Sequence, residues 1–565
     1  MNAQRTALFG IASIVPLLVI LLVGVIIWIS LTFNDSGPTG IISLRNFLVA
    51  FRDPFTVTAI SNTVYFTIVT LLVAFFFGIP IAWLSERTDI GGRHVIYLVM
   101  ILGLVMPTYF MAMGWILFAH PQIGILNIAL QRMFGLSQPL FNISTVYGMG
   151  FVEGLSLAPH VFVMASSAFR LMNPSLEEAG EVHGLRRSQV ARRISLPLLT
   201  PALAAAAIYV GMIAASAFDV PAVIGMGDRI YTFSTMIYVT ALSPDQSPRY
   251  GIPAAVGVVM CLIGFATTLW YVRFLKSARK FQIVSGKAFR PSRAKLERGR
   301  WFGWLFIGFF IFFSFGVPLI TVTWASLLPF LVMPSLAALK FLSLSQYQTL
   351  DWSLMVRGGI NTTILFVIVP TITIGFSLPI AWVITRSRSK LRFIYELLVF
   401  LPHAVPKIIF GIAALLLGLF LLDRILPIYG TIWLIVIIYV VERITFSSRV
   451  LNASMMQIHE ELEEAAMVSG MSAFGVLRYV ILPILWPTIL SIWLWIALLC
   501  YKELTVAAVL FSPKSITMPV VIWSMWAGGG MGRAAAATLV MMAAFVPLLG
   551  LYWLCGRRRE GASEL

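Results

Sequence analysis

Charged residues are scarce in this chain, and their scarcity excludes a soluble protein. Only 11% of the 565 residues are Asp, Glu, Lys or Arg, whereas 59% are hydrophobic. A soluble domain carries about 25% charged residues, so the composition predicts a protein that lies in a lipid bilayer. The 40 Lys and Arg outnumber the 23 Asp and Glu, and cytoplasmic loops of membrane proteins accumulate such an excess.

Cysteine is almost absent, and the patterns typical of metal and nucleotide sites are missing. The three cysteines, Cys261, Cys500 and Cys555, each lie alone in an apolar run, which favours small core residues over a metal site or a disulfide framework. The nucleotide-binding pattern Gly-x4-Gly-Lys-Ser/Thr does not occur, so we predict that the chain is no enzyme and does not itself hydrolyse ATP. We also expect no directly bound cofactor, no metal and no nucleic-acid partner.

Long hydrophobic runs dominate what is present. A bilayer-spanning helix needs about 20 apolar residues, and twelve stretches meet this need, approximately 7–33, 55–84, 95–119, 146–169, 199–218, 252–272, 301–328, 358–384, 394–422, 426–448, 484–506 and 534–555. The first run is longer than the core of a signal peptide, so we expect a retained membrane helix. The predicted fold is an all-α membrane protein with about 12 transmembrane helices.

Two short motifs recur at a constant distance along the chain. Asn62-Thr63 and Pro80-Ile81-Ala82-Trp83 recur as Asn361-Thr362 and Pro379-Ile380-Ala381-Trp382, and both pairs lie 299 residues apart (361 − 62 and 379 − 80). Six helices per repeat keep both halves in the same orientation, with a pseudo-two-fold axis along the membrane normal. We therefore predict a first transmembrane half at 1–275, a basic cytoplasmic linker at 276–300 and a second transmembrane half at 301–565.

One patterned loop occurs in each half, between the fourth and fifth predicted helices. The first copy reads Glu178-Ala179-Gly180-Glu181-Val182-His183-Gly184, then nine residues, then Ile194-Ser195-Leu196-Pro197. The second copy reads Glu464-Ala465-Ala466-Met467-Val468-Ser469-Gly470, then nine residues, then Val480-Ile481-Leu482-Pro483. Two copies with equal spacers are poorly explained as amphipathic hairpins that merely lie at the membrane surface.

Each loop reads as a short helix that stops at a glycine and turns back into the membrane at a proline. In the first copy, Ser175 and Glu178 have the spacing of a capping box, Gly184 suits a helix end and Pro197 suits a first helical turn. Small residues such as Ala179 leave a flat surface on which another protein can pack, and the neighbouring acids offer partners for its basic groups.

These loops resemble the EAA loop of binding-protein-dependent ABC importer permeases, whose pattern is Glu-Ala-Ala, three residues, Gly, nine residues, Ile-x-Leu-Pro. This chain departs from the pattern at Gly180 and at Val480. In that family the loop enters a cleft on an ATPase subunit, so the resemblance implies ATPase-coupling loops in both halves. It names Glu178, Ala179, Gly180, Gly184, Ile194, Leu196 and Pro197 in the first loop, and Glu464, Ala465, Ala466, Gly470, Val480, Leu482 and Pro483 in the second.

The resemblance also implies partners, location and substrate. We expect two cytoplasmic ABC ATPase subunits that use ATP, a periplasmic substrate-binding protein, and a place in the bacterial inner membrane with both termini cytoplasmic. Basic residues gather in the segments that this orientation puts inside. The segments Leu401–Pro406, Phe218–Ala222 and Tyr501–Glu503 are similar to fused permeases for ferric iron and thiamine. Ferric iron is the first choice, and thiamine, polyamines and organophosphonates remain open.

Two acidic residues fall near the end of the fifth helix of each half. Asp219 follows Pro197 by 22 residues and Glu503 follows Pro483 by 20, which places both about 30 Å from the inner face at about 1.5 Å per residue. They are candidates for a gate or for the substrate pathway, because ionisable groups in membrane helices are costly. The alternative is a water-solvated helix end. For the chain as a whole, a secondary transporter remains the rival class, although that class leaves the paired loops unexplained.

Overall fold

The computed structural model describes residues 2–34, 37–242, 249–278, 294–387, 392–422, 426–544, 547 and 550. Helices make up most of this part of the chain. Its one sheet is a pair of two-residue strands, β1 (Phe33–Asn34) and β2 (Gly37–Pro38). The predicted all-α class is therefore confirmed.

The two halves present similar series of helices. The first half contains α1 (Asn2–Thr32), α2 (Arg45–Arg52), α3 (Pro54–Arg87), α4 (Arg93–Val105), α5 (Thr108–Ala119), α6 (Ile125–Phe134), α7 (Val146–Leu171), α8 (Pro174–Val182), α9 (Arg187–Val190), η1 (Ala191–Ser195), α10 (Leu196–Ala215), η2 (Pro221–Gly225), α11 (Phe233–Leu242) and α12 (Gly251–Ala278). The second half contains α13 (Gly299–Ile311), η4 (Phe312–Gly316), α14 (Val317–Ser326), η5 (Ala338–Phe341), α15 (Ser345–Gln348), α16 (Trp352–Arg386), α17 (Arg392–Ala404), α18 (Lys407–Leu416), η6 (Leu417–Leu422), α19 (Ile432–Met455), α20 (Glu460–Val468), α21 (Ala473–Val476), η7 (Leu477–Ile481), α22 (Leu482–Tyr501), α23 (Thr505–Leu510) and α24 (Met518–Ala527), and a further helix runs over Met531–Ala544.

The twelve predicted membrane segments all coincide with helices of this series. By length and composition, seven described helices can cross a membrane, or nine if each of two bent pairs forms one span. The remaining predicted segments fall on α12, on α19, which carries Glu442 and Arg443 in its apolar run, and on Met531–Ala544. The last segment was predicted to reach 555, and its end and Cys555 lie outside the described residues.

Two of the predicted spans are wrong in shape, because each is broken by a proline. We expected single helices at 95–119 and 394–422, whereas α4 and α5 meet at 94° and α17 and α18 meet at 99°. Pro107 and Pro406 occupy the two breaks and lie 299 residues apart, as the repeated motifs do. Proline removes a backbone donor and disfavours helical geometry at the residue before it, so both helices bend at the same point of the repeat.

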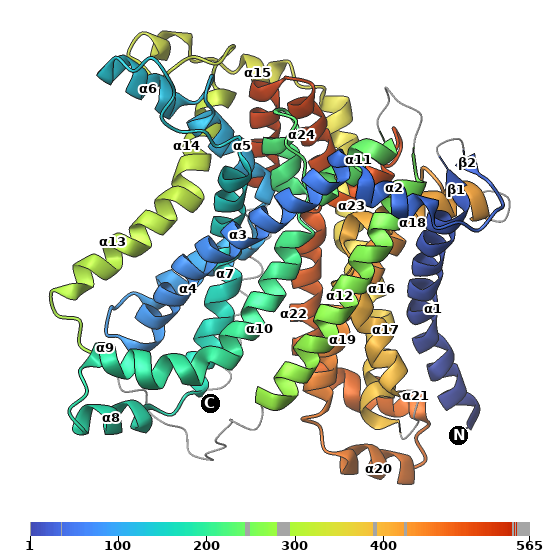
Figure 1. Ribbon diagram of the computed structural model, residues 1–565. Coiled ribbons are helices and arrows are strands. Elements are labelled where there is room, and N and C mark those ends of the chain that lie inside the picture. The colour runs from blue at the N-terminus through green and yellow to red at the C-terminus, as the bar shows by residue number, and fades with distance from the viewer. Residues whose placement is uncertain are drawn as a thin grey trace.

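The halves exchange their first helices. Helix α1 packs on α16, α17 and α18 of the second half, where the hydroxyls of Ser13 and Tyr395 lie 2.5 Å apart. In return α14 packs on α5, with Thr321 Oγ1 donating to the Gly114 carbonyl at 3.0 Å. A Cβ at Gly114 would lie 2.3 Å from Pro318 Cα, so only glycine permits this approach. The dark-blue α1 therefore stands beside the yellow and orange helices in Figure 1.

The end of the predicted linker docks on the first half. The carboxylate of Asp89 accepts a hydrogen bond from the Leu296 backbone at 2.8 Å and pairs with Arg300. The hydrogen bond from Arg300 lowers the pKa of the Asp89 carboxyl. Residues 279–293 of the linker lie outside the described residues, and the predicted boundaries at 275 and 301 stay predictions.

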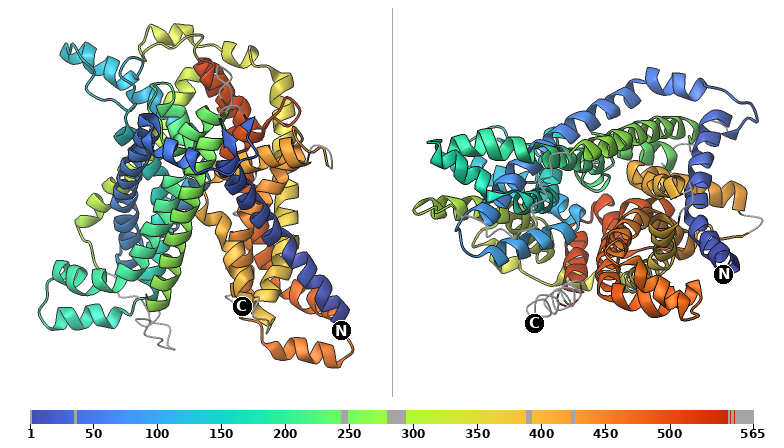
Figure 2. Two further views of the ribbon diagram at one scale, coloured as in Figure 1. Left: turned by 45° about the vertical axis from the view of Figure 1, so that its right-hand side comes forward. Right: turned by 90° about the horizontal axis from the view of Figure 1, so that it is seen from below.

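The helices form two groups that meet at one end of the molecule and diverge toward the other. Figures 1 and 2 show α6 and α15 at the joined end, and α8 and α20 at the ends of the two diverging groups. The fold thus places the two patterned loops on the same side of the molecule but in separate groups of helices.

Candidate functional site

Both patterned loops fold in the same way. Each consists of a nine-residue helix (α8 or α20), a short turn, and then a helical run that continues without interruption through a five-residue π-helical turn (η1 or η7) into α10 or α22. We predicted that the chain turns back at Pro197 and Pro483. The structure corrects this, because the returning helix already begins at Arg187 in the first loop and at Ala473 in the second.

Glycine ends the first helix of each loop, as the sequence predicted. Gly184 has φ +83° and Gly470 has φ +86°, a left-handed conformation that side-chain-bearing residues adopt at a cost. The backbone of Leu185 donates to the Gly180 carbonyl at 3.1 Å, and Met471 donates to Ala466 at 3.1 Å. This pattern satisfies carbonyls that a helix end otherwise leaves unpaired, so both turns have one fixed geometry.

The predicted capping box at Ser175 and Glu178 is wrong. Helix α8 begins with Pro174, and Asn173 is its cap, with Oδ1 accepting from the Ser175 backbone at 3.0 Å. The residue before Pro174 is restricted to an extended conformation, which moves the helix start ahead of Ser175. The cap of α20 is His459, whose side chain makes no cap hydrogen bond.

Each loop exposes the same small face. Glu178 and Ala179 are exposed on α8, and Glu464 and Ala465 are exposed on α20. The sequence analysis missed Val182 and Val468, which follow one turn later and are 85% and 89% exposed. The two loops therefore expose equivalent faces, each with an acid, an alanine and a valine at matching positions. The signal was available, because both valines lie inside the repeated motif.

The two departures from the family pattern fall on equivalent contacts, one in each loop. Gly180 is buried, and a Cβ there would lie 2.6 Å from Ile194 Cδ1. The second loop has Ala466 and Val480 at these positions, so both pairs hold the same number of side-chain carbon atoms. Of the other predicted residues, Leu196 and Pro197 are exposed at the start of α10, Pro483 is exposed on α22, and Leu482 is half-buried. These residues belong to the returning helices α10 and α22 and not to α8 or α20.

A buried arginine beneath each loop was also missed. Arg87, the last residue of α3, donates to the carbonyls of Phe169 and Met172 at 2.8 and 2.9 Å, and its Nη1 lies 3.5 Å from Glu177 Oε2. Ser195 donates to the other oxygen of Glu177 at 2.5 Å. Four structural elements therefore meet at one guanidinium and one carboxylate.

The second half repeats this arrangement with equivalent residues. Arg386, the last residue of α16, donates to the carbonyls of Met455 and Ile458 at 3.2 and 2.6 Å, and its Nε lies 2.7 Å from Glu463 Oε1. These three partners are the repeat equivalents of Phe169, Met172 and Glu177, at the offset of 286 residues that relates the loops. Extending the repeated Pro-Ile-Ala-Trp motif by four residues reaches both arginines, so this signal too was available.

Asp219 and Glu503 lie in one polar layer where the halves meet. Asp219 accepts from Thr108 Oγ1 at 2.6 Å and from Thr505 Oγ1, of the second half, at 3.2 Å. Glu503 is 6% exposed, and its Oε2 lies 2.7 Å from both Lys407 Nζ and Arg443 Nη2. The alternative of a water-solvated helix end is therefore wrong for Glu503.

Strictly, the repeat equivalent of Asp219 is Thr505, not Glu503, because the loops are offset by 286 residues. Asp219 and Thr505 touch, so this contact joins equivalent positions of the two halves. Next to it, Lys502 Nζ donates across the same boundary to the carbonyls of Leu104 and Met106, at 2.8 and 3.2 Å. The break between α4 and α5 leaves these two carbonyls available.

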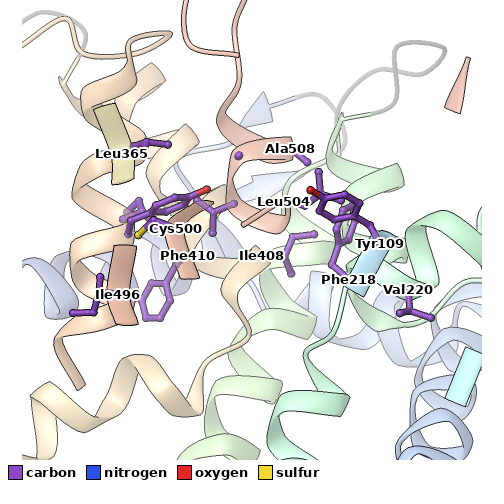
Figure 3. Packing of buried hydrophobic residues seen from close by; sticks show 14 of the residues in the cluster. Tyr109, Phe218, Val220, Leu365, Ile408, Phe410, Ile496, Cys500, Leu504 and Ala508 are labelled. Carbon is purple, nitrogen blue, oxygen red and sulfur yellow. The ribbon is translucent and has the colours of Figure 1, made fainter. Parts of the chain in front are cut away.

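Apolar contacts adjoin the polar layer. Tyr109, Phe218 and Leu504 belong to the same buried cluster, and Figure 3 shows their side chains together at the junction between the halves. The rings of Phe218 and Trp523, from opposite halves, lie 6.1 Å apart. Among the described residues there is no group of three or more His, Cys, Asp or Glu side chains placed to hold a metal ion.

A known protein family matches the chain twice. The binding-protein-dependent transport system inner membrane component family matches residues 76–280 and 374–561. The chain is 24% identical to a ferric transport system permease protein of Actinobacillus pleuropneumoniae over 77% of this chain and 62% of that protein. It is 22% identical to an Fe(3+)-transport system permease protein of Haemophilus influenzae over 90% of this chain and 91% of that one. The match to the first relative thus spans less than two thirds of its length.

Solved structures of low overall similarity also match. A bacterial ABC transporter involved in the import of the polysaccharide alginate is 20% identical over 43% of this chain and 85% of its own chain, with a TM-score of 0.35.

Proposed function

The chain belongs to the family of binding-protein-dependent transport system inner membrane components, and from this premise we propose that it is the transmembrane permease subunit of an ATP-driven ABC importer. Two copies of the family lie in tandem in one chain, so one polypeptide takes the place of a permease dimer. We place it in the bacterial inner membrane with both termini in the cytoplasm, because its basic residues gather in the segments that this orientation puts inside.

The observation that carries the proposal is the pair of matching loop faces at one end of the molecule. Glu178, Ala179 and Val182 on α8 correspond to Glu464, Ala465 and Val468 on α20, all exposed. Two faces with matching residues in separate groups of helices can each bind one of two identical partners, and two cytoplasmic ATPase subunits supply such a pair. The ATP is bound and hydrolysed by these subunits, while a periplasmic binding protein delivers substrate at the opposite end.

Ferric iron is the substrate that we propose. The support is the two relatives named for ferric transport, one of which aligns with 90% of this chain. Thiamine, polyamines and organophosphonates are the alternatives, because the binding protein supplies much of the selectivity in such importers. The choice is tested by comparing uptake of radiolabelled iron, delivered by a ferric-iron-binding protein, with uptake of each labelled alternative, delivered by its own binding protein.

The class of transporter is tested by its energy source. We expect proteoliposomes with this chain, its ATPase and its binding protein to take up substrate only when ATP is present on the side of the membrane where the ATPase lies. A proton or sodium gradient without ATP gives no uptake. Uptake by the permease alone, driven by such a gradient, contradicts the proposal and favours a secondary transporter.

We place the gate at the polar layer. The contacts of Lys502 with Leu104 and Met106 and of Thr505 with Asp219 join the two halves across the pseudo-two-fold axis. Substrate that passes between the halves requires these contacts to part. Glu503, held by Lys407 and Arg443 within its own half, orients the segment that carries Lys502 and Thr505.

The gate is tested by removing its cross-half hydrogen bonds. A Lys502→Met/Thr505→Val variant loses hydrogen bonds in which one partner is charged, either the Lys502 ammonium or the Asp219 carboxylate. Each such bond is worth about 1.5–3 kcal/mol, so the state in which the halves are joined becomes less favourable. We expect ATP hydrolysis without binding protein to rise about tenfold, which corresponds to about 1.4 kcal/mol. Lys514→Met is the control, since Lys514 is exposed away from this layer. Unchanged basal hydrolysis together with unchanged transport removes these residues from the gate.

A further inference from the structure

We call α8 and α20 the docking helices. Each is joined to the membrane helix before it, α7 or α19, by a short non-helical segment. Between α7 and α8 only Met172 and Asn173 intervene, both with extended backbone ψ angles of 129° and 119°. Between α19 and α20 the chain runs through residues 456–459 and ends in an extended His459 with ψ 136°. We call this segment the hinge, because a change in its backbone angles would reorient α8 or α20 without breaking hydrogen bonds within the membrane helix.

The arginine beneath each loop crosses this hinge. Arg87 holds one carbonyl in the last turn of α7, the carbonyl of the hinge residue Met172, and Glu177 beyond the hinge on α8. Arg386 holds Met455, at the end of α19, together with Ile458 and Glu463. The guanidinium presents its donors in one rigid plane, so a single side chain can fix the angle between two helices.

We propose that Arg87 and Arg386 are positioning residues that lock each docking helix to the ends of two membrane helices, α3 with α7 and α16 with α19. This inference rests on the proposed function, in which α8 and α20 receive the motion of the ATPase. With the lock in place, a displacement of α8 carries the ends of α3 and α7 with it. Without the lock, α8 pivots at the hinge and the displacement is lost before it reaches the membrane.

Burial makes these contacts suited to the task. The side chains of Arg87 and Arg386 are 4% and 9% exposed, and that of Glu463 is 8% exposed. Salt and water therefore screen these pairs less than they screen a surface ion pair. Neither arginine lies on the exposed faces of the loops, so their role is separable from docking itself.

The two locks differ in their additional contacts. Glu177 also accepts from Ser195, which ties the first lock to the returning helix. Among the described residues no hydroxyl donates to Glu463, but Arg386 gains a second carboxylate, Glu460, at 3.4 Å. The contacts of Arg87 and Glu177 thus connect α8 with the returning helix of the first loop, whereas the contacts of Arg386 lie mainly at the hinge before α20.

The test compares transport with ATP hydrolysis in proteoliposomes of the full permease, its ATPase and its binding protein. We expect Arg87→Lys and Arg386→Lys, and the milder pair Glu177→Gln and Glu463→Gln, to co-purify with the ATPase and to hydrolyse ATP at near the normal rate. The substrate transported per ATP falls about tenfold when both halves are altered. Glu396→Gln, an exposed carboxylate at the start of α17, is the matched control with an unchanged ratio.

A second readout follows the angle directly. Spin labels on the exposed surfaces of α8 and α3 report one narrow distance distribution in the wild type and a broad one in Glu177→Gln. A wild-type ratio with a narrow distribution in every variant overturns the inference. So does loss of ATPase binding in the glutamine variants, since the arginines then shape the docking surface instead. Uptake by wild-type permease without any ATPase refutes the proposed function itself, and the wild-type control detects that outcome separately.

Discussion

Reversing the charge of both docking loops in a Glu178→Lys/Glu464→Lys variant is expected to abolish ATPase binding and transport while the permease still inserts into the membrane. Both carboxylates are exposed on the loop faces, so neither supports the fold. Truncating one partner of a hydrogen-bonded charge pair at an interface costs about 2–5 kcal/mol, and lysine adds repulsion from basic groups on the partner. Co-purification of the ATPase and binding-protein-stimulated ATP hydrolysis measure the effect.

Single variants and a control separate docking from general damage. Each single variant leaves one of the two loops unaltered, so we expect partial ATPase binding and reduced transport. Glu396→Lys carries the same charge change at an exposed site on α17 and is expected to behave as wild type. Normal transport by the double variant contradicts the docking role of the loops, and normal assembly with lost transport assigns the two glutamates to a later step.

Neutralising Glu503 is expected to cause the largest loss of stability. In Glu503→Gln, the cations of Lys407 and Arg443 lose the carboxylate that both contact at 2.7 Å. The remaining acid, Glu442, lies 3.9 Å from Arg443. Breaking a buried ion pair by removing one partner costs about 3–5 kcal/mol, because the other charge is left uncompensated. The thermal unfolding midpoint in detergent measures the loss.

A compensating variant tests the cause of that loss. Adding Lys407→Met to Glu503→Gln removes one of the two cations that lose the Glu503 carboxylate, so we expect part of the stability to return. Glu396→Gln, whose side chain is exposed, is expected to change the free energy of unfolding by less than about 0.5 kcal/mol. A Glu503→Gln variant as stable as Glu396→Gln argues that water reaches the carboxylate and that the pair does not support the fold.

Much of the site was readable from the repeated sequence. The positions of both loops, their glycine stops at Gly184 and Gly470, and the exposure of Glu178 and Glu464 follow from local patterns. The cap at Asn173 was misread because Ser175 has the right spacing, whereas the restriction imposed by Pro174 on the preceding residue decides the helix start. The start of the returning helix was misread because Pro197 suits a first helical turn, whereas the helical run begins ten residues earlier, at Arg187, and passes through the π-helical turn η1 just before Pro197.

The contacts beneath the loops and between the halves needed the structure. Arg87 and Glu177 are 90 residues apart, and Asp219 meets Thr505 across 286 residues. A single sequence contains no signal for which distant polar residues meet. In lipid, moreover, the faces of helices that pack on one another are as apolar as those that face the acyl chains, so periodicity does not reveal neighbours.

The sequence by itself determined the positions of the apolar helices, the tandem repeat and the paired patterned loops. The reason is physical: in a bilayer every backbone polar group must be satisfied within its own segment, so about 20 apolar residues specify a spanning helix locally. Only the tertiary structure decided the right-angled breaks at Pro107 and Pro406, the exchange of first helices, the arginine locks and the meeting of Asp219 with Thr505. These features depend on close packing and hydrogen bonds between helices far apart in the chain, which form only when the whole bundle assembles.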